Sequence, residues 1–573
     1  MVGCVLFVHE FGRESLLLLF QESNPTFDKG NNTMLRKNLL MWSVVALFIL
    51  VIHSKSLAQI TTTWTGLEGS NWSSTNWTAG EPTSSVQAIL DNGDTAIINQ
   101  TGEACGTLTL GSTTIGVGKI EISGNALGDG QLFTHVDENI GNYGTGNFNQ
   151  TAGTNHVGNY FNIGYYSGSN GTYNLTGPGQ LTSVATEFVG RYGTGTFNQS
   201  AGTNTTLVTI WVGANSGSIG NYNLSNTGQV SSGWELIGES GFGTFKQSGG
   251  INTISNYLAL GFAYNGNGTY NLTGGTLILN QIRIGYGAAK FNFGGGTLQA
   301  NGTLSTTLPM TLTGDGGDAN VDTAGNTVTL DGILSGTGGL NKLGANTLTL
   351  GANNSYIGST TIMTGTLVLG STATLTSDVI SVANGAYFDV LAVSGGYSLG
   401  AAQTLKGSGT IVGNVTINGI HAPGDSPGVE TVQGNYNMLG QLQIEIKGTT
   451  AGTGYDQVLL SGSSAYNATL GGTLTLNWAD MNGSTDSTQL WILENDTAGT
   501  LSGVFSNYAN GASLGNYDGH DWYIWYGADA ATGNLTGGND VLISAVPEPS
   551  MIVLLMTAAL GIGVGSFQRK GHK

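Results

Sequence analysis

The chain has 573 residues, of which 95 are Gly, 9% are charged and 39% are hydrophobic, and its formal net charge is -19. Disordered chains combine high charge with few hydrophobic residues, so this composition argues against disorder and favours a repetitive, β-rich fold. The few, scattered Lys and Arg argue against nucleic acid as a partner, because neutralising phosphates needs clustered cations.

The N-terminal region predicts export. Arg36 and Lys37 precede an apolar stretch at 39–52, and small residues lead up to Ala58 and Gln59, between which a signal peptidase would cut. We therefore predict a signal peptide at 34–58 and an upstream extension at 1–33 that the expressed protein lacks, with Met34 as its start. Cys105 is then the one cysteine of the exported chain, which excludes an intramolecular disulfide.

Residues 59–130 contain Trp64, Trp72 and Trp77 among Gly and Asn turns. A stack of β coils needs its first open edge covered, so we predict an N-terminal β cap here. The alternative is that these tryptophans are exposed and bind glycans.

Residues 131–300 are periodic. An aromatic residue followed by Asn or Lys recurs about every 24 residues, and an aliphatic residue before Gly recurs between these pairs. Short alternating segments between Gly and Asn turns predict strands of about five residues. The arrangement that buries one side of every such strand is a right-handed parallel β-helix or β-solenoid, with coils about 4.8 Å apart. The aromatic pairs are Phe148-Asn149, Tyr173-Asn174, Phe197-Asn198, Tyr222-Asn223, Phe245-Lys246, Tyr270-Asn271 and Phe291-Asn292.

Stacking of the coils would align the repeated residues into ladders. The rings would stack, the Asn side chains would bond to their copies above and below, and the Gly residues would supply positive φ at each corner. Coils with Phe-Asn-Gln alternate with coils with Tyr-Asn-Leu, so the repeating unit can be two coils long. The aromatic ladder has two interpretations, which are packing within the solenoid and a groove on which sugars stack.

Residues 301–430 contain a different repeat, with Gly-Leu, Lys-x-Gly, Leu-Thr-Leu, Tyr-x-Gly-x-Thr and Gly-Thr-Leu in this order between 335 and 369. This segment resembles the autotransporter-associated β-strand repeat, which implies a parallel β-helix on the cell surface. Residues 431–545 form a C-terminal β region that is either a β-sandwich or further coils.

Residues 546–573 combine a Pro-rich break, an apolar run at 551–567 and a basic end. A helix of about 17 residues is about 25 Å long, at the lower limit for one transmembrane helix. The order of these parts resembles the PEP-CTERM sorting signal of Gram-negative bacteria, with Pro547, Glu548 and Pro549 matching its motif. The resemblance implies an exosortase-like partner in the inner membrane, whereas the alternative is an ordinary tail anchor.

The sequence contains few candidates for catalytic residues. Glu187 with Arg191, and Glu235 with Glu239, occupy matching positions two coils apart, but we interpret them as solvated corner charges rather than catalytic pairs. Asp315, Asp318 and Asp322 could ligate Ca²⁺, but their spacing lacks the repeated Gly-Gly-x-Gly-x-Asp pattern of calcium-binding β-rolls, which favours a turn. We predict no catalytic residue, no cofactor and no other metal site.

The sequence as a whole predicts an all-β protein: a right-handed parallel β-helix/β-solenoid with an N-terminal β cap, a C-terminal β region and one C-terminal transmembrane helix. Its predicted role is that of an exported, non-enzymatic structural or adhesive component of the cell envelope or the extracellular polysaccharide matrix, with exopolysaccharide as a candidate partner. The alternative function is a β-helix that binds or degrades polysaccharide.

Overall fold

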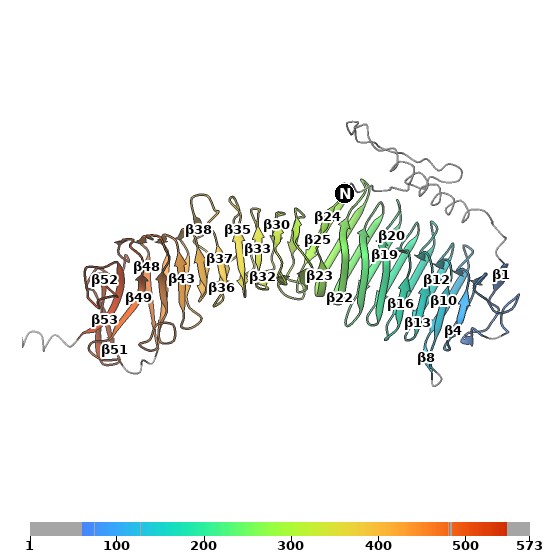
Figure 1. Cartoon of the computed structure of the whole chain (residues 1–573), viewed down its shortest axis with the longest axis horizontal. Coiled ribbons are helices and arrows are strands. Elements are labelled where there is room, and N and C mark those ends of the chain that lie inside the picture. Colours follow the sequence, from blue (N-terminus) through green and yellow to red (C-terminus); the bar gives the residue numbers. More distant parts are fainter. Residues whose placement is uncertain (1–59, 74, 126–127, 480, 482–483, 547–573) are drawn as a thin grey trace, which may run out of the picture. The chain divides into compact units, whose positions relative to one another are not determined.

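The computed structural model describes residues 60–73, 75–125, 128–479, 481 and 484–546. In these residues the chain is all-β and winds into a right-handed parallel β-solenoid of about 16 turns, without a helix (Figure 1). Accordingly, the described part holds no helix that is long and apolar enough to cross a membrane. The predicted signal peptide with Ala58 and Gln59 lies outside the described residues, and so do residues 547–573 of the predicted sorting segment, with its transmembrane helix.

The N-terminal part of the solenoid has three stacks of parallel strands, to which successive coils add strands. The first stack contains the aromatic-Asn pairs, and long strands such as β22 continue round a corner into the next stack. Its strands are β2 (Ser70–Asn71), β4 (Asn92–Ile98), β7 (Val117–Ile122), β12 (Thr145–Gln150), β15 (Asn170–Leu175), β18 (Thr194–Gln199), β20 (Ile219–Leu224), β22 (Phe242–Leu260), β23 (Asn267–Leu279), β25 (Ala288–Phe293), β28 (Met310–Leu312) and β31 (Leu334–Gly336).

The second stack continues furthest along the chain without a break. It shares β22 and β23 with the first stack, and its other strands are β5 (Glu103–Cys105), β10 (Gln131–Thr134), β13 (Thr154–Val157), β16 (Gln180–Ser183), β19 (Thr203–Val212), β21 (Gln229–Ile237), β26 (Thr297–Ala300), β29 (Ala319–Asp322), β32 (Leu340–Leu343), β34 (Thr360–Ile362), β36 (Val379–Val382), β39 (Thr404–Gly407), β42 (Ile420–Pro423), β45 (Gln441–Ile446) and β48 (Thr473–Trp478).

The third stack begins with the first described strand. It shares parts of β19, β21 and β22, and its other strands are β1 (Ile60–Thr63), β3 (Val86–Leu90), β6 (Leu108–Leu110), β11 (Glu138–Ile140), β14 (Phe161–Ile163), β17 (Thr186–Val189) and β24 (Ile282–Ile284). Parallel pairing therefore starts at β1–β3, within the segment predicted as a cap. A short antiparallel hairpin, β8 (Gly124–Asn125) and β9 (Gly128–Asp129), interrupts this region.

Two further sheets complete the solenoid and settle the alternatives for residues 431–545. The coils continue to β50 (Leu501–Gly503), and the antiparallel strands β51 (Ser513–Tyr517), β52 (His520–Ala528) and β53 (Asp540–Val546) close the C-terminal end. One sheet has β27 (Leu304–Thr306), β30 (Val328–Leu330), β33 (Thr347–Leu350), β35 (Thr366–Leu369), β37 (Tyr387–Asp389), β40 (Thr410–Val412), β43 (Val429–Gln433), β46 (Gln457–Leu460), β49 (Gln489–Asn495), β53 (Asp540–Val546), β52 (His520–Ala528) and β51 (Ser513–Tyr517). The other has β38 (Tyr397–Leu399), β41 (Val415–Ile417), β44 (Tyr436–Met438), β47 (Ala468–Leu470) and β50 (Leu501–Gly503).

The aromatic ladder lies inside the solenoid. Its seven rings, from Phe148 to Phe291, are buried, and successive ring centroids are 4.6–5.4 Å apart. This spacing is close to the distance between coils, so each ring stacks on its copy in the next coil. The packing interpretation is confirmed, and a sugar-binding groove on these rings is excluded because they have no exposed face.

The predicted Asn ladder is confirmed on the outer side of the same strands. The amide of Asn174 donates to Asn149, that of Asn198 to Asn174 and that of Asn223 to Asn198, each at 2.8 Å. Lys246 interrupts the series, which resumes with Asn292 donating to Asn271 at 2.7 Å. An amide carries both a donor and an acceptor, so identical side chains satisfy one another along the stack.

The tryptophans near the N-terminal end are core residues. Trp64, Trp72 and Trp77 are buried, with edge-to-face contacts of 5.0 Å between Trp64 and Trp77 and 4.7 Å between Trp72 and Trp77. The indole N–H of Trp77 donates to the carbonyl of Trp72 at 2.9 Å. The alternative of exposed, glycan-binding tryptophans is therefore wrong.

Corner glycines are required both by φ and by the closeness of the next coil. Gly190 has φ of 76°, and a Cβ added there would lie 2.2 Å from the carbonyl oxygen of Ile219. Gly164, Gly213, Gly238 and Gly261 repeat this geometry, as predicted, whereas the corner at Gly285 has no positive φ. The corner glycine thus lets coils approach to β-sheet distance.

A pair of Gly→Ala substitutions separates these two requirements. Gly217 also has positive φ, 80°, but no atom lies within 4 Å of the position of its Cβ. We expect Gly217→Ala to cost about 1–2 kcal/mol of stability for the left-handed backbone alone. Gly190→Ala should cost about 1–3 kcal/mol more, because the Cβ would push against the next coil. Urea unfolding followed by circular dichroism measures both, and equal losses would contradict the close-packed corner.

Candidate functional site

The carboxylates that the sequence offered as catalytic pairs are inside the solenoid. Glu187 and Glu235 are fully buried, and so is Glu138 at the equivalent position two coils earlier. Their interpretation as solvated corner charges is wrong, because the alternation of the third stack turns these positions inward. The coils between them have Phe161 and Ile210 at the same register.

Each buried carboxyl belongs to a hydrogen-bonded unit with one Asn, one Tyr and one Gln. Around Glu187, the Asn204 amide donates to both carboxyl oxygens at 3.1 and 3.0 Å and also to the Tyr222 hydroxyl at 3.0 Å. The Tyr222 hydroxyl donates to Gln199 at 2.7 Å, and the Thr206 hydroxyl donates to Glu187 at 2.7 Å. The unit therefore links all three stacks across the interior.

The same unit occurs three times, once every second coil. Around Glu138 the Asn, Tyr and Gln are Asn155, Tyr173 and Gln150, and around Glu235 they are Asn252, Tyr270 and Gln247. In the intervening coils apolar residues take the Glu, Asn and Gln positions, as Leu181 does between Asn155 and Asn204. The two-coil period predicted from the sequence thus corresponds to a polar unit that alternates with an apolar layer.

Burial makes these carboxyls weak acids. It raises the pKa of Glu187 to about 7 and those of Glu138 and Glu235 to about 8, while the bonds from Asn and from the hydroxyl groups offset part of the rise. A carboxyl of raised pKa resembles a general acid, but catalysis also requires that substrate reach it. These groups have no solvent-exposed surface, so we assign them a structural role.

The residues that were paired with them by sequence lie elsewhere. Arg191 is on the outer side, with its guanidinium over the rings of Tyr160, Tyr165 and Phe188 at 5.4, 4.8 and 4.5 Å. Glu239 is half-buried at a corner and is bonded to the Ser240 hydroxyl. Neither contributes to a catalytic pair with the buried glutamates.

The structure contains a second buried polar cluster, which the sequence did not predict. His421 and Glu430 are both fully buried and form a short contact through Nε2 and Oε2, while Nδ1 of His421 lies 2.7 Å from the Tyr436 hydroxyl. Burial raises the pKa of Glu430 despite the adjacent His421. The three residues lie on three successive strands of one coil, β42, β43 and β44, so the winding of the chain brings their side chains together and no sequence motif marks them.

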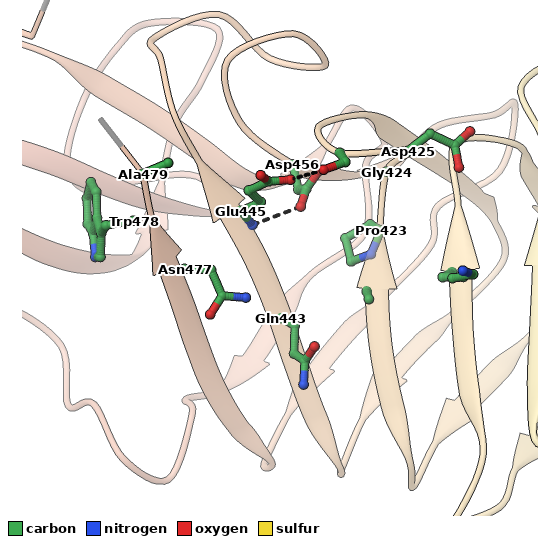
Figure 2. A pocket seen from close by; sticks show the side chains of 12 residues that line it. Pro423, Gly424, Asp425, Gln443, Glu445, Asp456, Asn477, Trp478 and Ala479 are labelled. Carbon is green, nitrogen blue, oxygen red and sulfur yellow. Dashed lines mark hydrogen bonds between the residues drawn. The ribbon is translucent and has the colours of Figure 1, made fainter. Parts of the chain in front are cut away.

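A groove with a volume of about 690 Å³ lies over the outer side of β42, β45 and β48. Figure 2 shows Glu445 and Asp456 on its wall, close to the loop of Pro423, Gly424 and Asp425. Asp456 accepts bonds from the backbone amides of Gly428 at 2.9 Å and Glu445 at 2.8 Å, and burial raises its pKa to about 6.

The other carboxylates of this groove are also bonded within the protein. Glu445 accepts a bond from the Ser426 hydroxyl at 2.6 Å and lies 3.8 Å from the Lys447 ammonium. Asp425 accepts a bond from the Ser408 hydroxyl at 2.7 Å. These bonds hold the loop against the solenoid, so we interpret the carboxylates that line the groove as groups that anchor a turn.

The structure does not bring Asp315, Asp318 and Asp322, the possible calcium ligands, together as a metal site. Across the described ranges, no group of three or more His, Cys, Asp or Glu residues is arranged to hold a metal. Asp318 accepts a bond from the amide of Gly339, and Asp322 accepts bonds from the amide of Ala324 and the side chain of Gln299. Asp318 and Asp322 thus secure turns between coils, and Asp315 takes no part in these bonds.

The residues of the second repeat have clear structural roles. Lys342 is buried, and its ammonium donates to the carbonyls of Leu343, Gly344 and Thr364 at 2.9, 2.7 and 3.0 Å. The Tyr356 hydroxyl lies 2.6 Å from that of Thr360. The Lys-x-Gly and Tyr-x-Gly-x-Thr patterns therefore satisfy polar groups inside the coils.

Fold and repeat together define a class of protein, a β-solenoid similar to the passenger domains of autotransporters. Residues 340–369 match the family described as Passenger-associated-transport-repeat, which confirms the resemblance found in this segment. A particular relative is the adhesin BmaC autotransporter of Brucella suis biovar 1 (strain 1330), 34% identical over 157 residues. The aligned region covers 26% of this chain and 5% of that adhesin, so the likeness concerns a small part of the relative.

The buried glutamates predict an unusual dependence of stability on pH. Between about pH 4.5 and about pH 8 the unfolded chain releases these protons while the folded chain retains them, so stability falls as the pH rises. The contribution of Glu187 is on the order of 3 kcal/mol. Glu187→Gln should reduce this loss, since the free Oδ1 of Asn204 can accept a bond from the new amide once the Asn204 side chain rotates.

Thermal unfolding at pH 5 and pH 8 measures this effect. Glu239→Gln removes a carboxylate at a surface corner and controls for the change in net charge. A wild-type Tm that is the same at both pH values, or rises with pH, would contradict the burial of neutral carboxyls.

Proposed function

We propose that the protein is an exported, non-enzymatic structural or adhesive β-solenoid of the cell envelope or extracellular polysaccharide matrix of a Gram-negative bacterium. The observation that carries the proposal is the continuous passenger-like solenoid. Its buried glutamates pack inside the coils, and Asp318 and Asp322 stabilise turns. The similarity to part of an adhesin autotransporter supports an adhesive role at the cell surface.

Delivery is proposed to follow the C-terminal signal. Pro547, Glu548 and Pro549, the apolar run and the basic end would engage an exosortase-like enzyme while the helix holds the chain in the inner membrane. The support for this step is the order of these parts in the sequence.

The absence of catalysis is proposed on chemical grounds. Glycoside hydrolysis requires an accessible carboxyl pair that can exchange protons with substrate and water. Glu187 and Glu235 are buried inside the solenoid, and Asp456 has both oxygens bonded to backbone amides. The alternative function is a polysaccharide-degrading β-helix, with the groove at Glu445 and Asp456 as a candidate site.

Surface delivery is tested with the full chain in a bacterium that encodes an exosortase-like enzyme. Replacing Pro547, Glu548 and Pro549 together with Ala should retain the protein in the membrane fraction and abolish its detection on intact cells. Ser550→Ala, directly beside the motif, serves as the matched control and should leave delivery unchanged. Equal surface labelling of the triple variant and the wild type would contradict the sorting proposal.

The non-enzymatic role is tested by adhesion and by product analysis. Cells that display the protein should adhere to polysaccharide-coated surfaces more than cells lacking it, and the purified chain should release no new reducing or unsaturated ends. Cleavage that Glu445→Gln or Asp456→Asn abolishes would establish the enzymatic alternative.

A further inference from the structure

A row of aromatic and arginine side chains lies on the outer side of the third stack. It crosses six consecutive coils, those of β14, β17, β19, β21, β22 and β24, which pair in this order. At about 4.8 Å per step, it extends about 24 Å along the stack. We name it the aromatic–arginine strip, and it consists of Tyr160, Phe188, Arg191, Trp211, Trp234, Tyr257 and Arg283.

The rings of the strip touch from coil to coil within two groups, Tyr160 with Phe188 and Trp211, and Trp234 with Tyr257. Ring centroids are 5.9 Å apart for Tyr160 and Phe188, 5.5 Å for Phe188 and Trp211, and 6.3 Å for Trp234 and Tyr257. Phe188 and Trp211 share one register position, and Trp234 and Tyr257 share another. The strip is thus a built surface of two adjoining rows rather than a scatter of single residues.

The strip remains open to solvent although its rings pack sideways. Tyr160 is 37% exposed, Arg283 is exposed, Trp211, Trp234, Tyr257 and Arg191 are half-buried, and Phe188 is buried. The interior ladder already supplies the register and the core, so an outer aromatic row is not needed to hold the coils. Contiguous aromatic surface that a fold leaves uncovered is typical of an interaction site.

Two guanidinium groups give the strip a positive character within an acidic chain. Arg191 lies over Phe188 at 4.5 Å and Arg283 over Tyr257 at 4.1 Å. Their side-chain hydrogen bonds go to neutral groups, Asn162 at 3.1 Å and Gln281 at 3.3 Å, and neither forms an ion pair with a carboxylate that the structure describes. The forked face of an aromatic-stacked arginine suits a carboxylate ligand.

We propose that the aromatic–arginine strip binds an extended acidic polysaccharide, with sugar rings on Trp211, Trp234 and Tyr160 and uronate carboxylates on Arg191 and Arg283. The inference rests on the proposed function and names the place and the chemical class of its matrix partner. The chain is otherwise strongly acidic, with a formal net charge of -19, so the charge at this strip is what can overcome repulsion of an anionic polymer. A continuous strip also suits a polymer, because successive sugars can follow successive coils.

The test measures binding of the purified full chain to polygalacturonate and to neutral dextran by titration calorimetry at two salt concentrations. Trp211→Ala with Trp234→Ala should weaken binding to polygalacturonate by about tenfold or more. Arg191→Gln with Arg283→Gln should weaken it by a similar factor and reduce its dependence on salt. The matched control combines Tyr387→Ala with Lys290→Gln, an exposed aromatic residue and an exposed cation off the strip, and should bind like the wild type.

Circular dichroism and Tm of each variant show that the solenoid is intact, since the replaced side chains are on the outer side. Unchanged binding by both double variants, equal affinity for dextran, or no binding to polygalacturonate would overturn the proposal. If the variants instead lose self-association in light scattering and keep polysaccharide binding, the strip is a contact between copies and the proposal is also overturned. Adhesion of cells that display the strip variants distinguishes failure of this proposal from failure of the proposed function. If the strip variants adhere like the wild type, the strip proposal fails and the proposed function stands. If the wild type itself does not adhere, the proposed function fails.

Discussion

Parallel stacking of coils places each residue directly above its counterpart, so a side chain must be compatible with a copy or a neighbour about 4.8 Å away. Aromatic rings and amides meet this requirement, because rings stack and an amide is both donor and acceptor. Carboxyl groups do not, since two ionised carboxylates at this distance would repel each other in an apolar interior. This constraint explains why Asn149, Asn174 and Asn198 repeat in every coil, whereas Glu138, Glu187 and Glu235 appear in every second coil.

The same constraint shapes the interior chemistry. Separating the glutamates with an apolar coil lets each one use its own Asn and, through it, its own Tyr and Gln. The raised pKa of each carboxyl then keeps it largely neutral below about pH 7, which lowers the cost of burying it. A polar unit of this kind favours one register over others, because a shift by one coil would place Asn204 opposite an apolar residue instead of Glu187. Groups that resemble catalytic residues in the sequence thus determine how the coils align.

The sequence predicted what is periodic and local. The Phe148 to Phe291 ladder, the Asn ladder, the corner at Gly190 and the passenger-type repeat at 340–369 all follow from a repeated spacing, which the fold converts directly into stacking. The buried glutamates were misjudged because Glu is rarely buried, although their recurrence in phase with Asn and Tyr was a usable signal. The aromatic–arginine strip was missed for another reason. It depends on the outward register of six coils, including the irregularity in β19 between Thr206 and Thr209, and no local pattern encodes it.

These features divide the molecule between an interior that is neutral and self-complementary and an outer surface on which recognition can occur. The central claim is that Glu138, Glu187 and Glu235 are buried, neutral and structural. Infrared spectroscopy of the protonated carboxyl stretch, with Glu→Gln substitution at the three positions for assignment, tests it most directly. The account predicts protonated-carboxyl bands that persist at pH 6, disappear between about pH 7 and pH 9, and are absent from the triple variant. Loss of all such bands by pH 5, as for solvated carboxyls, would contradict it.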